Sequence, residues 1–308
     1  MVQRLLIFKK IRMTNSLSYY LTIAVIKLKG IKRSFGNDPI DYKKLRKEDV
    51  FLPNNSFFKR HTLNKYQVLS STIIEVGTKK EADSLVLFIH GGAFVSGPAK
   101  HHWDAIKTIV KQTSHTVWLC RYPKAPEYDI LQISKNIDAL YSLALEKYSA
   151  SKIYIIGDSV GGTLATALIQ RLIALKKELP KKILLISPVM DASMSNPAIQ
   201  SLEEIDPMLS IQGVVSAKKM CAGSMDLKAP IISPIYGSFD QFPSTLIFMA
   251  QHDIMYPDQK IALSKLLKAK VDVKSIEGKR MPHIWPLLPF MKEAKIALQE
   301  ITKALKDS

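Results

Sequence analysis

An apolar run that stops abruptly at a glycine-rich turn constrains this 308-residue chain more than any other feature. The run spans residues 152–156 and is rich in β-branched side chains, and Gly-Asp-Ser-Val-Gly-Gly follows at 157–162. Short apolar runs of this kind are typical of buried strands. The pattern G-x-S-x-G after a strand predicts a sharp turn that presents Ser159 at the strand end. The Ala- and Leu-rich stretch 163–178 predicts the helix that follows. Alone, the short pattern also fits an ordinary glycine turn.

A serine in such a turn needs partners, because its hydroxyl is a poor nucleophile at neutral pH. A histidine must take its proton, and a carboxylate must orient that histidine. In chains with this motif the order is Ser, then Asp or Glu, then His. Of the seven histidines, only His252 and His283 follow Ser159. His252 directly precedes the best acid candidate, so we expect His283 to be the base.

The acid should follow a strand that lies between the serine and the base. Residues 244–250 read as a buried parallel strand, and Asp253 comes shortly after it, with Asp258 as the alternative. Because parallel strands end at one edge of a sheet, an acid there can meet the serine. Taken singly, Asp253 also fits a helix cap or a turn, and His283 also fits a surface loop.

A second glycine-rich segment follows another apolar run. Residues 84–89 predict a strand, and His-Gly-Gly-Ala-Phe follows at 90–94. Small residues let backbone amides converge on one oxygen, which would stabilise a negative charge there. We expect His90 to be structural and the donors to be amides of this segment and of the residue after the serine. They are Gly91, Gly92, Ala93 and Val160.

Together, the two glycine motifs resemble those of the hormone-sensitive-lipase-like carboxylesterases of the α/β-hydrolase family, typically H-G-G-G and G-D-S-A-G-G. Further similar segments lie in the expected order across residues 60–300, including Ala-Pro-Glu at 125–127. The resemblance implies an α/β-hydrolase fold with a mostly parallel central sheet, helices on both faces and a helical cap. It also implies that Ser159 is the nucleophile, Asp253 the orienting acid and His283 the base and then acid. The acyl group would pass to serine and then to water, with no metal or organic cofactor.

Three positions depart from the family pattern: Ala93 replaces the third glycine, Val160 replaces alanine, and Arg121 replaces an aspartate. None of them removes a member of the triad. An alanine keeps its N–H, and Val160 should narrow the space beside the nucleophile.

Bulky apolar residues near the motifs predict a small acyl pocket. The segment 206–209 resembles a substrate-pocket feature of the family, and we expect Phe94, Met208 and Trp285 to line the pocket. Each of these types is also typical of a core. The sequence therefore favours a carboxylesterase acting on short-chain acyl or acetyl esters of small molecules. An amidase, a deacetylase or a peptidase on the same fold remains an alternative. So does a non-enzymatic ligand-binding relative, which typically lacks a triad member.

Length and composition predict one α/β domain over residues 1–308. A hydrophobic content of 47% supports a large core, and strand-like runs alternate with helical ones, as in a sheet covered on both faces. We expect residues 1–50 and about 192–223 to contribute the helical cap.

The chain carries a net charge of +17. No nucleic-acid motif accompanies the charge, and the lysines are spread along the chain, so we expect no nucleic-acid partner. Residues 1–35 contain no Asp or Glu, and their apolar run at 17–26 is shorter than the ~20 residues a bilayer span needs. This basic segment could also contact anionic membrane surfaces.

The two cysteines, Cys120 and Cys221, do not suggest a disulfide framework, which favours a reducing cytoplasm. His101 and His102 are adjacent and should not face one site on a helix, so we expect no metal there. The sequence leaves self-association into a homo-oligomer open.

Overall fold

The computed structural model describes residues 8–9, 15–61, 63–77 and 82–306. Its centre is a nine-stranded sheet in the order β1-β9-β8-β7-β6-β4-β5-β3-β2. All neighbouring pairs are parallel except those made by β3, which is antiparallel to β2 and to β5. The strands are β1 Phe8–Lys9, β2 Leu63–Val68, β3 Ser71–Val76, β4 Leu85–Ile89, β5 Thr116–Arg121, β6 Ile153–Asp158, β7 Lys182–Ile186, β8 Ser244–His252 and β9 Val273–Pro282.

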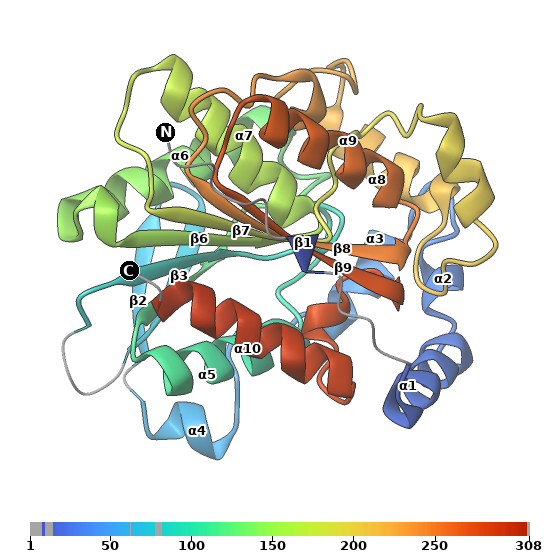
Figure 1. Cartoon of the computed structure of the whole chain (residues 1–308), viewed down its shortest axis with the longest axis horizontal. Coiled ribbons are helices and arrows are strands. Elements are labelled where there is room, and N and C mark those ends of the chain that lie inside the picture. The colour runs from blue at the N-terminus through green and yellow to red at the C-terminus, as the bar shows by residue number, and fades with distance from the viewer. Residues whose placement is uncertain (1–7, 10–14, 62, 78–81, 307–308) are drawn as a thin grey trace.

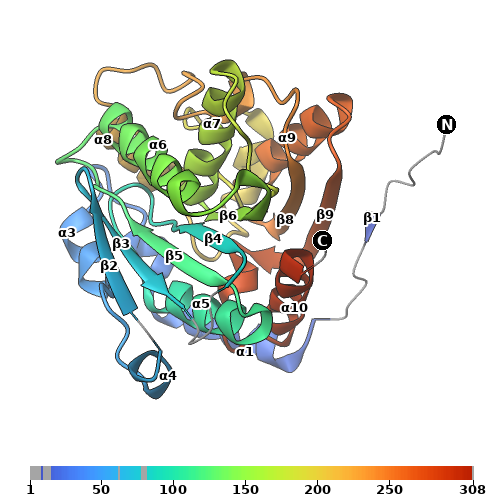
Figure 2. The same cartoon turned by 90° about the vertical axis from the view of Figure 1, so that its left-hand side faces the viewer.

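Helices cover both faces of this sheet (Figure 1, Figure 2). Helices α5 and α10 lie on one face, and α6, α7 and α9 lie on the other. The helices are α1 Leu17–Leu28, α2 Ile31–Ser34, α3 Tyr42–Leu45, α4 Ser56–Lys59, α5 Lys100–Thr113, α6 Ile130–Lys147, α7 Val160–Ala174, α8 Ile211–Ala222, α9 Tyr256–Lys268 and α10 Lys292–Lys306. Short 3-10 turns are η1 Arg46–Glu48, η2 Ala150–Lys152, η3 Pro197–Leu202, η4 Pro234–Tyr236 and η5 Trp285–Leu287. Among the helices of the described residues, none is long and apolar enough to cross a bilayer.

Burial explains why the central strands read as continuous apolar runs. Every residue of β4 and of β6 is buried, because helices cover the sheet on both sides. Strand β7 is an apolar run after its first residue, Lys182, and β4 begins one residue later than predicted. The α/β-hydrolase fold expected from the resemblance is confirmed.

Both ends of the predicted helix at 163–178 are wrong. The helix after the glycine turn begins at Val160 and ends at Ala174, earlier at both ends than the predicted 163–178. It begins early because the turn is only Ser159, and it ends early because Lys176 takes a left-handed φ of 51°. Strand β9 continues through residues 279–282, because Pro282 pairs with His252 beyond a register shift in β8.

Candidate active site

A turn of one residue carries Ser159. Strand β6 ends at Asp158 and α7 begins at Val160, so Ser159 alone makes the turn, with φ 52° and ψ −124°. Glycine is required on both sides of the turn. A Cβ at Gly157 would lie 2.5 Å from the carbonyl oxygen of Gly161, and one at Gly161 would lie 2.0 Å from that of Ile89. Ser159 is held by its own amide, which donates to the carbonyl of Ile186 at 2.9 Å, and its side chain stays partly exposed.

His283 and Asp253 meet at the carboxyl ends of β8 and β9. The ring Nδ1–H of His283 donates to Oδ2 of Asp253 at 2.8 Å, and both side chains are buried. Asp253 also accepts from the amide of Met255 at 2.8 Å and from Nε2 of Gln259 at 3.2 Å. Because the carboxylate can only accept, it fixes the proton on Nδ1 and leaves a lone pair on Nε2. That Nε2 atom is buried and has no hydrogen-bond partner among the described residues.

Two opposing effects set the pKa of His283. Burial disfavours the charged ring and lowers its pKa, but the charge and hydrogen bond of Asp253, together with the charges of Asp206 and Asp158, outweigh burial. The net result is a pKa above the ordinary value of 6.5. The ring is therefore a stronger base than a free histidine.

The alternative acid lies elsewhere. Asp258 sits in the first turn of α9, and its Oδ1 accepts from Nδ2 of Asn196 at 2.8 Å. Asp253, and not Asp258, is the carboxylate that the structure brings to His283.

The glycine-rich segment after β4 packs directly against the serine. A Cβ at Gly91 would lie 2.9 Å from Cβ of Ser159. The next three residues, Gly92, Ala93 and Phe94, all have left-handed φ angles of 123°, 54° and 64°. The amide of Gly91 already donates to Oδ1 of Asp158 at 3.0 Å, so Gly91 holds the segment in place. The role of Gly92, Ala93 and Val160 as amide donors to a substrate oxygen stays a prediction.

Sequence reasoning missed a buried network behind the serine, made by Asp158, His101 and His102. Nδ1 of His102 accepts from the amide of Ala99 at 2.8 Å, so the neutral ring carries its proton on Nε2. This Nε2 lies 3.2 Å from Oδ1 of Asp158 and 3.1 Å from Nε2 of His101. The expectation that the two adjacent rings face different sites is wrong, because the first turn of α5 directs both toward Asp158.

The same three side chains have the composition of a metal site, since their ligand atoms lie within 4.8 Å of one another. Histidine ligands of metals donate their other ring N–H to an acceptor. In His102 the other nitrogen faces a donor, the amide of Ala99. The residues therefore fit a hydrogen-bond network that holds Asp158 better than they fit a metal ion. Burial opposes the charge of Asp158, but His102 and the Gly91 amide outweigh burial and lower its pKa.

Asp206 also has a structural role that the sequence did not predict. Its Oδ1 accepts from the amides of Met208 and Leu209 at 2.8 and 2.9 Å, and its Oδ2 accepts from the amide of Ile254 at 2.9 Å. Burial and the neighbouring charge of Asp253 raise the pKa of Asp206 to about 7. Asp206 thus joins the predicted pocket segment to the loop that carries the acid.

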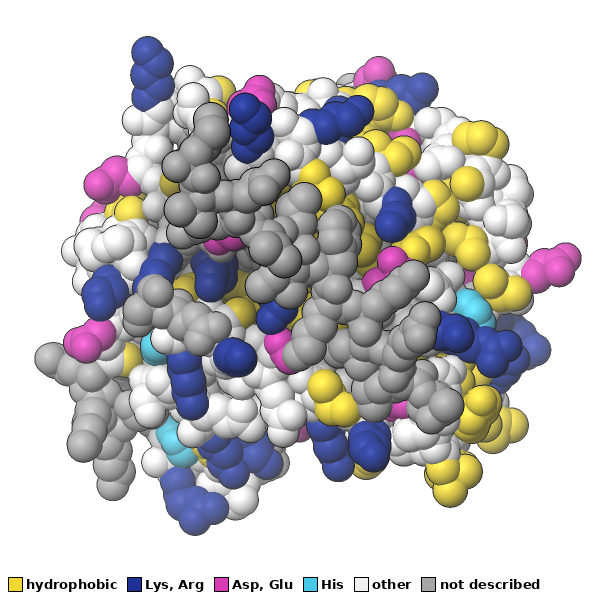
Figure 3. Space-filling model, in the orientation of Figure 1, with side chains coloured by type: hydrophobic (Ala, Val, Ile, Leu, Met, Phe, Trp, Pro, Cys, Tyr) yellow, Lys and Arg dark blue, Asp and Glu magenta, His cyan; other side chains and the backbone are white. Residues whose placement is uncertain are grey.

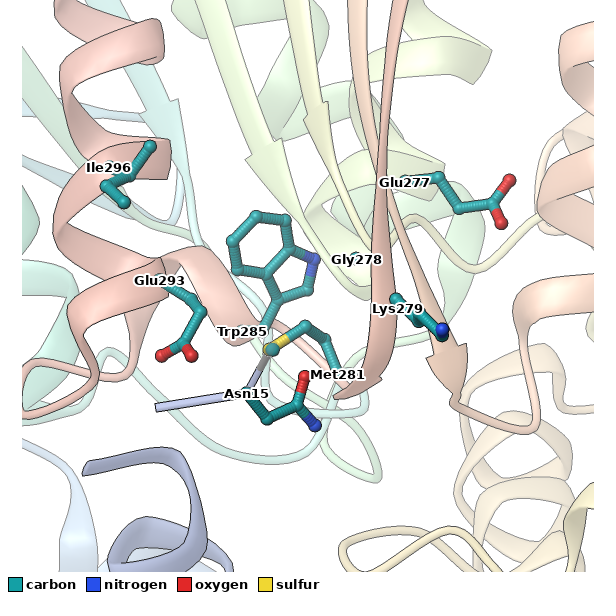
Figure 4. Close-up of a pocket in the computed structure, with 8 residues that line it drawn as sticks. All are labelled: Asn15, Glu277, Gly278, Lys279, Met281, Trp285, Glu293 and Ile296. Atoms are coloured by element: carbon teal, nitrogen blue, oxygen red, sulfur yellow. The ribbon is translucent and has the colours of Figure 1, made fainter. Parts of the chain in front are cut away.

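The predicted pocket residues Phe94, Met208 and Trp285 are all buried. The indole N–H of Trp285 donates to the carbonyl of Met249 at 3.1 Å. Its ring lines a cavity between β9 and α10, beside Met281 and Ile296 (Figure 4). At about 20 Å³ this cavity has room for about one water molecule, which is too little for an ester. Val160 directly follows Ser159, and Met208 is joined to the acid loop through Asp206. Contact of these two residues, of Phe94 and of Trp285 with substrate stays a prediction.

The sequence and the fold both match known proteins. A family model for the α/β hydrolase fold matches residues 86–287, more than half of the chain. An esterase of Acinetobacter venetianus is 28% identical over 237 residues, covering 74% of this chain and 77% of that protein. The structure of a candidate esterase from Staphylococcus aureus is 27% identical with a TM-score of 0.80, covering 87% of this chain and 90% of that one. An esterase structure from the bacterial hormone-sensitive lipase family shares the fold, at 22% identity and a TM-score of 0.82 over 96% of this chain and 99% of that one. The chain therefore belongs to the α/β-hydrolase fold family, among esterase- and lipase-like relatives, as its two glycine motifs predicted.

Proposed function

We propose that the chain is a serine carboxylic ester hydrolase with Ser159, His283 and Asp253 as its catalytic triad. The observation that carries this proposal is the 2.8 Å hydrogen bond from His283 to Asp253, which leaves Nε2 of the ring buried and unpaired at the edge of the sheet where Ser159 sits. Relatives named esterase, triacylglycerol lipase and acetyl-hydrolase support the same class of reaction.

The proposed reaction follows from these positions. Nε2 of His283 accepts the proton of Ser159 as Oγ attacks the ester carbonyl, and the charge of Asp253 stabilises the imidazolium that forms. The negative oxygen of the tetrahedral intermediate accepts hydrogen bonds from the amides of Gly92, Ala93 and Val160. His283 then returns the proton to the departing alcohol, which leaves an acyl group on Ser159. Water, deprotonated by His283, releases the acid and restores the serine.

The proposed cap rests on contacts between the two segments predicted to form it. The side chain of Lys32 donates to the carbonyl of Glu203, and the amide of Ile40 donates to Oγ of Ser216 at 2.9 Å. A Cβ at Gly213 would overlap the carbonyl of Phe35, so α8 packs closely on the end of α2. We propose that this joint cap and the side chains of Phe94, Val160 and Met208 limit the acyl group to short chains.

A chain-length series of p-nitrophenyl esters tests the activity and the preference. We expect hydrolysis of the acetate and butyrate, with rates that fall for long acyl chains. Ser159→Ala and His283→Ala should each lower kcat by several orders of magnitude, and the double variant by little more, because triad members act as a unit. Ser151→Ala, which changes an exposed serine on η2, is the matched control and should keep full activity. Wild-type turnover by Ser159→Ala would refute the triad, and rates that rise steadily to long chains would refute the short-chain preference.

The competing hydrolase classes differ in the leaving group that they release. A p-nitroanilide carrying the same acyl group separates an amidase or peptidase from an esterase, and acetylated sugars separate a deacetylase. We expect ester cleavage to be faster than anilide cleavage. A cytoplasmic location remains a proposal, and both cysteines are buried and free.

A further inference from the structure

The outward face of α1 is apolar, which reverses the usual arrangement of a surface helix. The inward side of the helix buries Tyr19 and Ile26. The opposite side is exposed to solvent, with Leu28 at 86% and Leu17 at 75% of their full accessible surface. With about 100° between successive residues, these exposed side chains form one continuous stripe. We call it the α1 stripe; its members are Leu17, Tyr20, Leu21, Ala24, Val25 and Leu28.

Basic side chains border the α1 stripe on both sides. By helical geometry Lys27 lies along one edge and Lys29 along the other, and both are exposed. Helix α2 follows at once and adds Lys32 and Arg33. Residues 1–35 contain no acidic side chain at all. Figure 3 shows hydrophobic side chains where α1 lies at the lower right, with a cluster of Lys and Arg next to them.

An exposed aromatic residue extends this surface. Phe290 is 80% exposed and lies in the turn before α10. That turn is held against the start of α1, because the amide of Lys292 donates to Oγ of Ser18 at 3.0 Å. Oγ of Ser16 also donates to Glu293 at 3.0 Å. The apolar surface is therefore built on a helix that is anchored at its N-terminal end.

We propose that the α1 stripe docks on the surface of an anionic lipid bilayer, with α1 lying in the plane of the interface. An apolar stripe between lysines suits this position, because the leucines enter the boundary of the acyl chains while the ammonium groups reach the anionic headgroups. A second copy of the chain fits the stripe less well. Pairing two α1 faces would bring Lys27 and Lys29 of one copy against basic groups of the other, and each copy carries a net charge of +17.

Docking in this way would bring the proposed active-site edge close to the lipid. The hydroxyl of Tyr19 donates to the carbonyl of Arg280 at 3.0 Å, three residues before His283. Figure 1 shows α1 beside the carboxyl ends of β8 and β9, the strands that lead to Asp253 and His283. The docking proposal is independent of the proposed chemistry, since vesicle binding is measured without turnover.

Vesicle co-sedimentation of the full chain tests this surface. The vesicles are phosphatidylcholine alone, or phosphatidylcholine mixed with phosphatidylglycerol, at low and at high salt. The first variant, Leu21→Glu with Leu28→Glu, places acids on the α1 stripe, and Leu175→Glu, an exposed leucine after α7, is its control. The second variant, Lys27→Gln with Lys29→Gln, removes the bordering charges, and Lys176→Gln with Lys177→Gln is its control. Circular dichroism and thermal melting check that each variant is folded, without reference to the proposed activity.

We expect binding to the anionic vesicles that weakens with salt. Binding should be lost with the two glutamates and reduced roughly fivefold for each lysine removed, while both controls bind like the wild type. Equal binding to both lipid mixtures, or wild-type binding by the two-glutamate variant, would overturn the proposal. Dimerisation that the two glutamates abolish, without vesicle binding, would also overturn it and assign the stripe to a second copy.

Discussion

Ser159 is held in a backbone conformation that few residues adopt. Its φ of 52° and ψ of −124° cost about 1–3 kcal/mol, which the surrounding sheet and helix must offset. The offset comes from close packing of Gly91 on one side and, on the other, from the hydrogen bond that the amide of Ser159 donates to the carbonyl of Ile186. The serine is thus placed before substrate arrives, and His283 is oriented in the same way by Asp253.

The environment of His283 leads to an expected pH dependence. Only the neutral ring can accept the serine proton, and Asp253 holds the pKa above 6.5 in spite of burial. We therefore expect kcat/KM for p-nitrophenyl acetate to rise with pH through a midpoint above 6.5 and then to level off. Asp253→Asn removes the stabilising charge, so it should lower this midpoint and reduce kcat about 10⁴-fold. A midpoint below 6.5 in the wild type would contradict this account of the ring.

Among single residues, the sequence indicated the three triad candidates. It did not indicate the neighbouring residues that hold them in place. Asp253 and His283 could be predicted because their order along the chain and their positions after strand-like runs can be read directly from the sequence. The network of His102 with Asp158 and the bridge made by Asp206 join segments that are far apart in sequence. No spacing rule indicates such contacts, although the position of Asp158 inside the serine motif was a usable signal.

The one-residue turn at Ser159 depends on the close approach of β4, β6 and α7. A Cβ at Gly161 would lie 2.0 Å from the carbonyl oxygen of Ile89, and backbone atoms on both sides leave little room to move. We expect Gly161→Ala to lower the free energy of unfolding by about 3 kcal/mol or more. Gly77→Ala is the matched control, because its Cβ would meet only Oγ1 of Thr116 at 3.7 Å. Chemical denaturation compares the free energies of unfolding of the two variants. Equal values would show that the backbone around the serine turn can shift to make room for the new Cβ.

The sequence predicted which strands form more readily than it predicted where each strand begins and ends. Strand β4 is apolar throughout, and β7 is apolar after Lys182, because both faces of the sheet are covered, so their limits are visible in the sequence. The end of β9 was not visible, since residues 279–282 include two basic residues and a proline, and Pro282 pairs with β8 only beyond a register shift. Tertiary pairing decided that boundary, not local propensity.

A buried lysine links α8 to the segment that follows β7, so its ionisation affects the stability of the whole molecule. Nζ of Lys218 donates to the carbonyl of Asp191 at 3.0 Å. Burial lowers the pKa of Lys218 from 10.5 to about 7, although the charges of Asp191 and Asp258 oppose the shift. Between these two pH values the unfolded chain binds a proton that the folded chain does not. Lys218 therefore makes stability rise with pH over this range.

A melting series over this range tests the buried lysine. We expect the Tm of the wild type to include a contribution that rises from about pH 7 upward. In Lys218→Met this contribution should be absent, so Tm should depend less on pH. Lys219→Met, the exposed neighbour on α8, should keep the wild-type profile. Parallel profiles for the wild type and Lys218→Met would mean that Lys218 stays charged in the folded chain.

The catalytic role of Ser159 is tested most directly by the mass of the protein after reaction with a fluorophosphonate ester, followed by peptide mapping. We expect one phosphonyl group per chain, located on Ser159, together with complete loss of esterase activity. The Ser159→Ala chain should gain no mass. An adduct on another residue, or full esterase activity in a chain whose Ser159 is fully modified, would contradict the account.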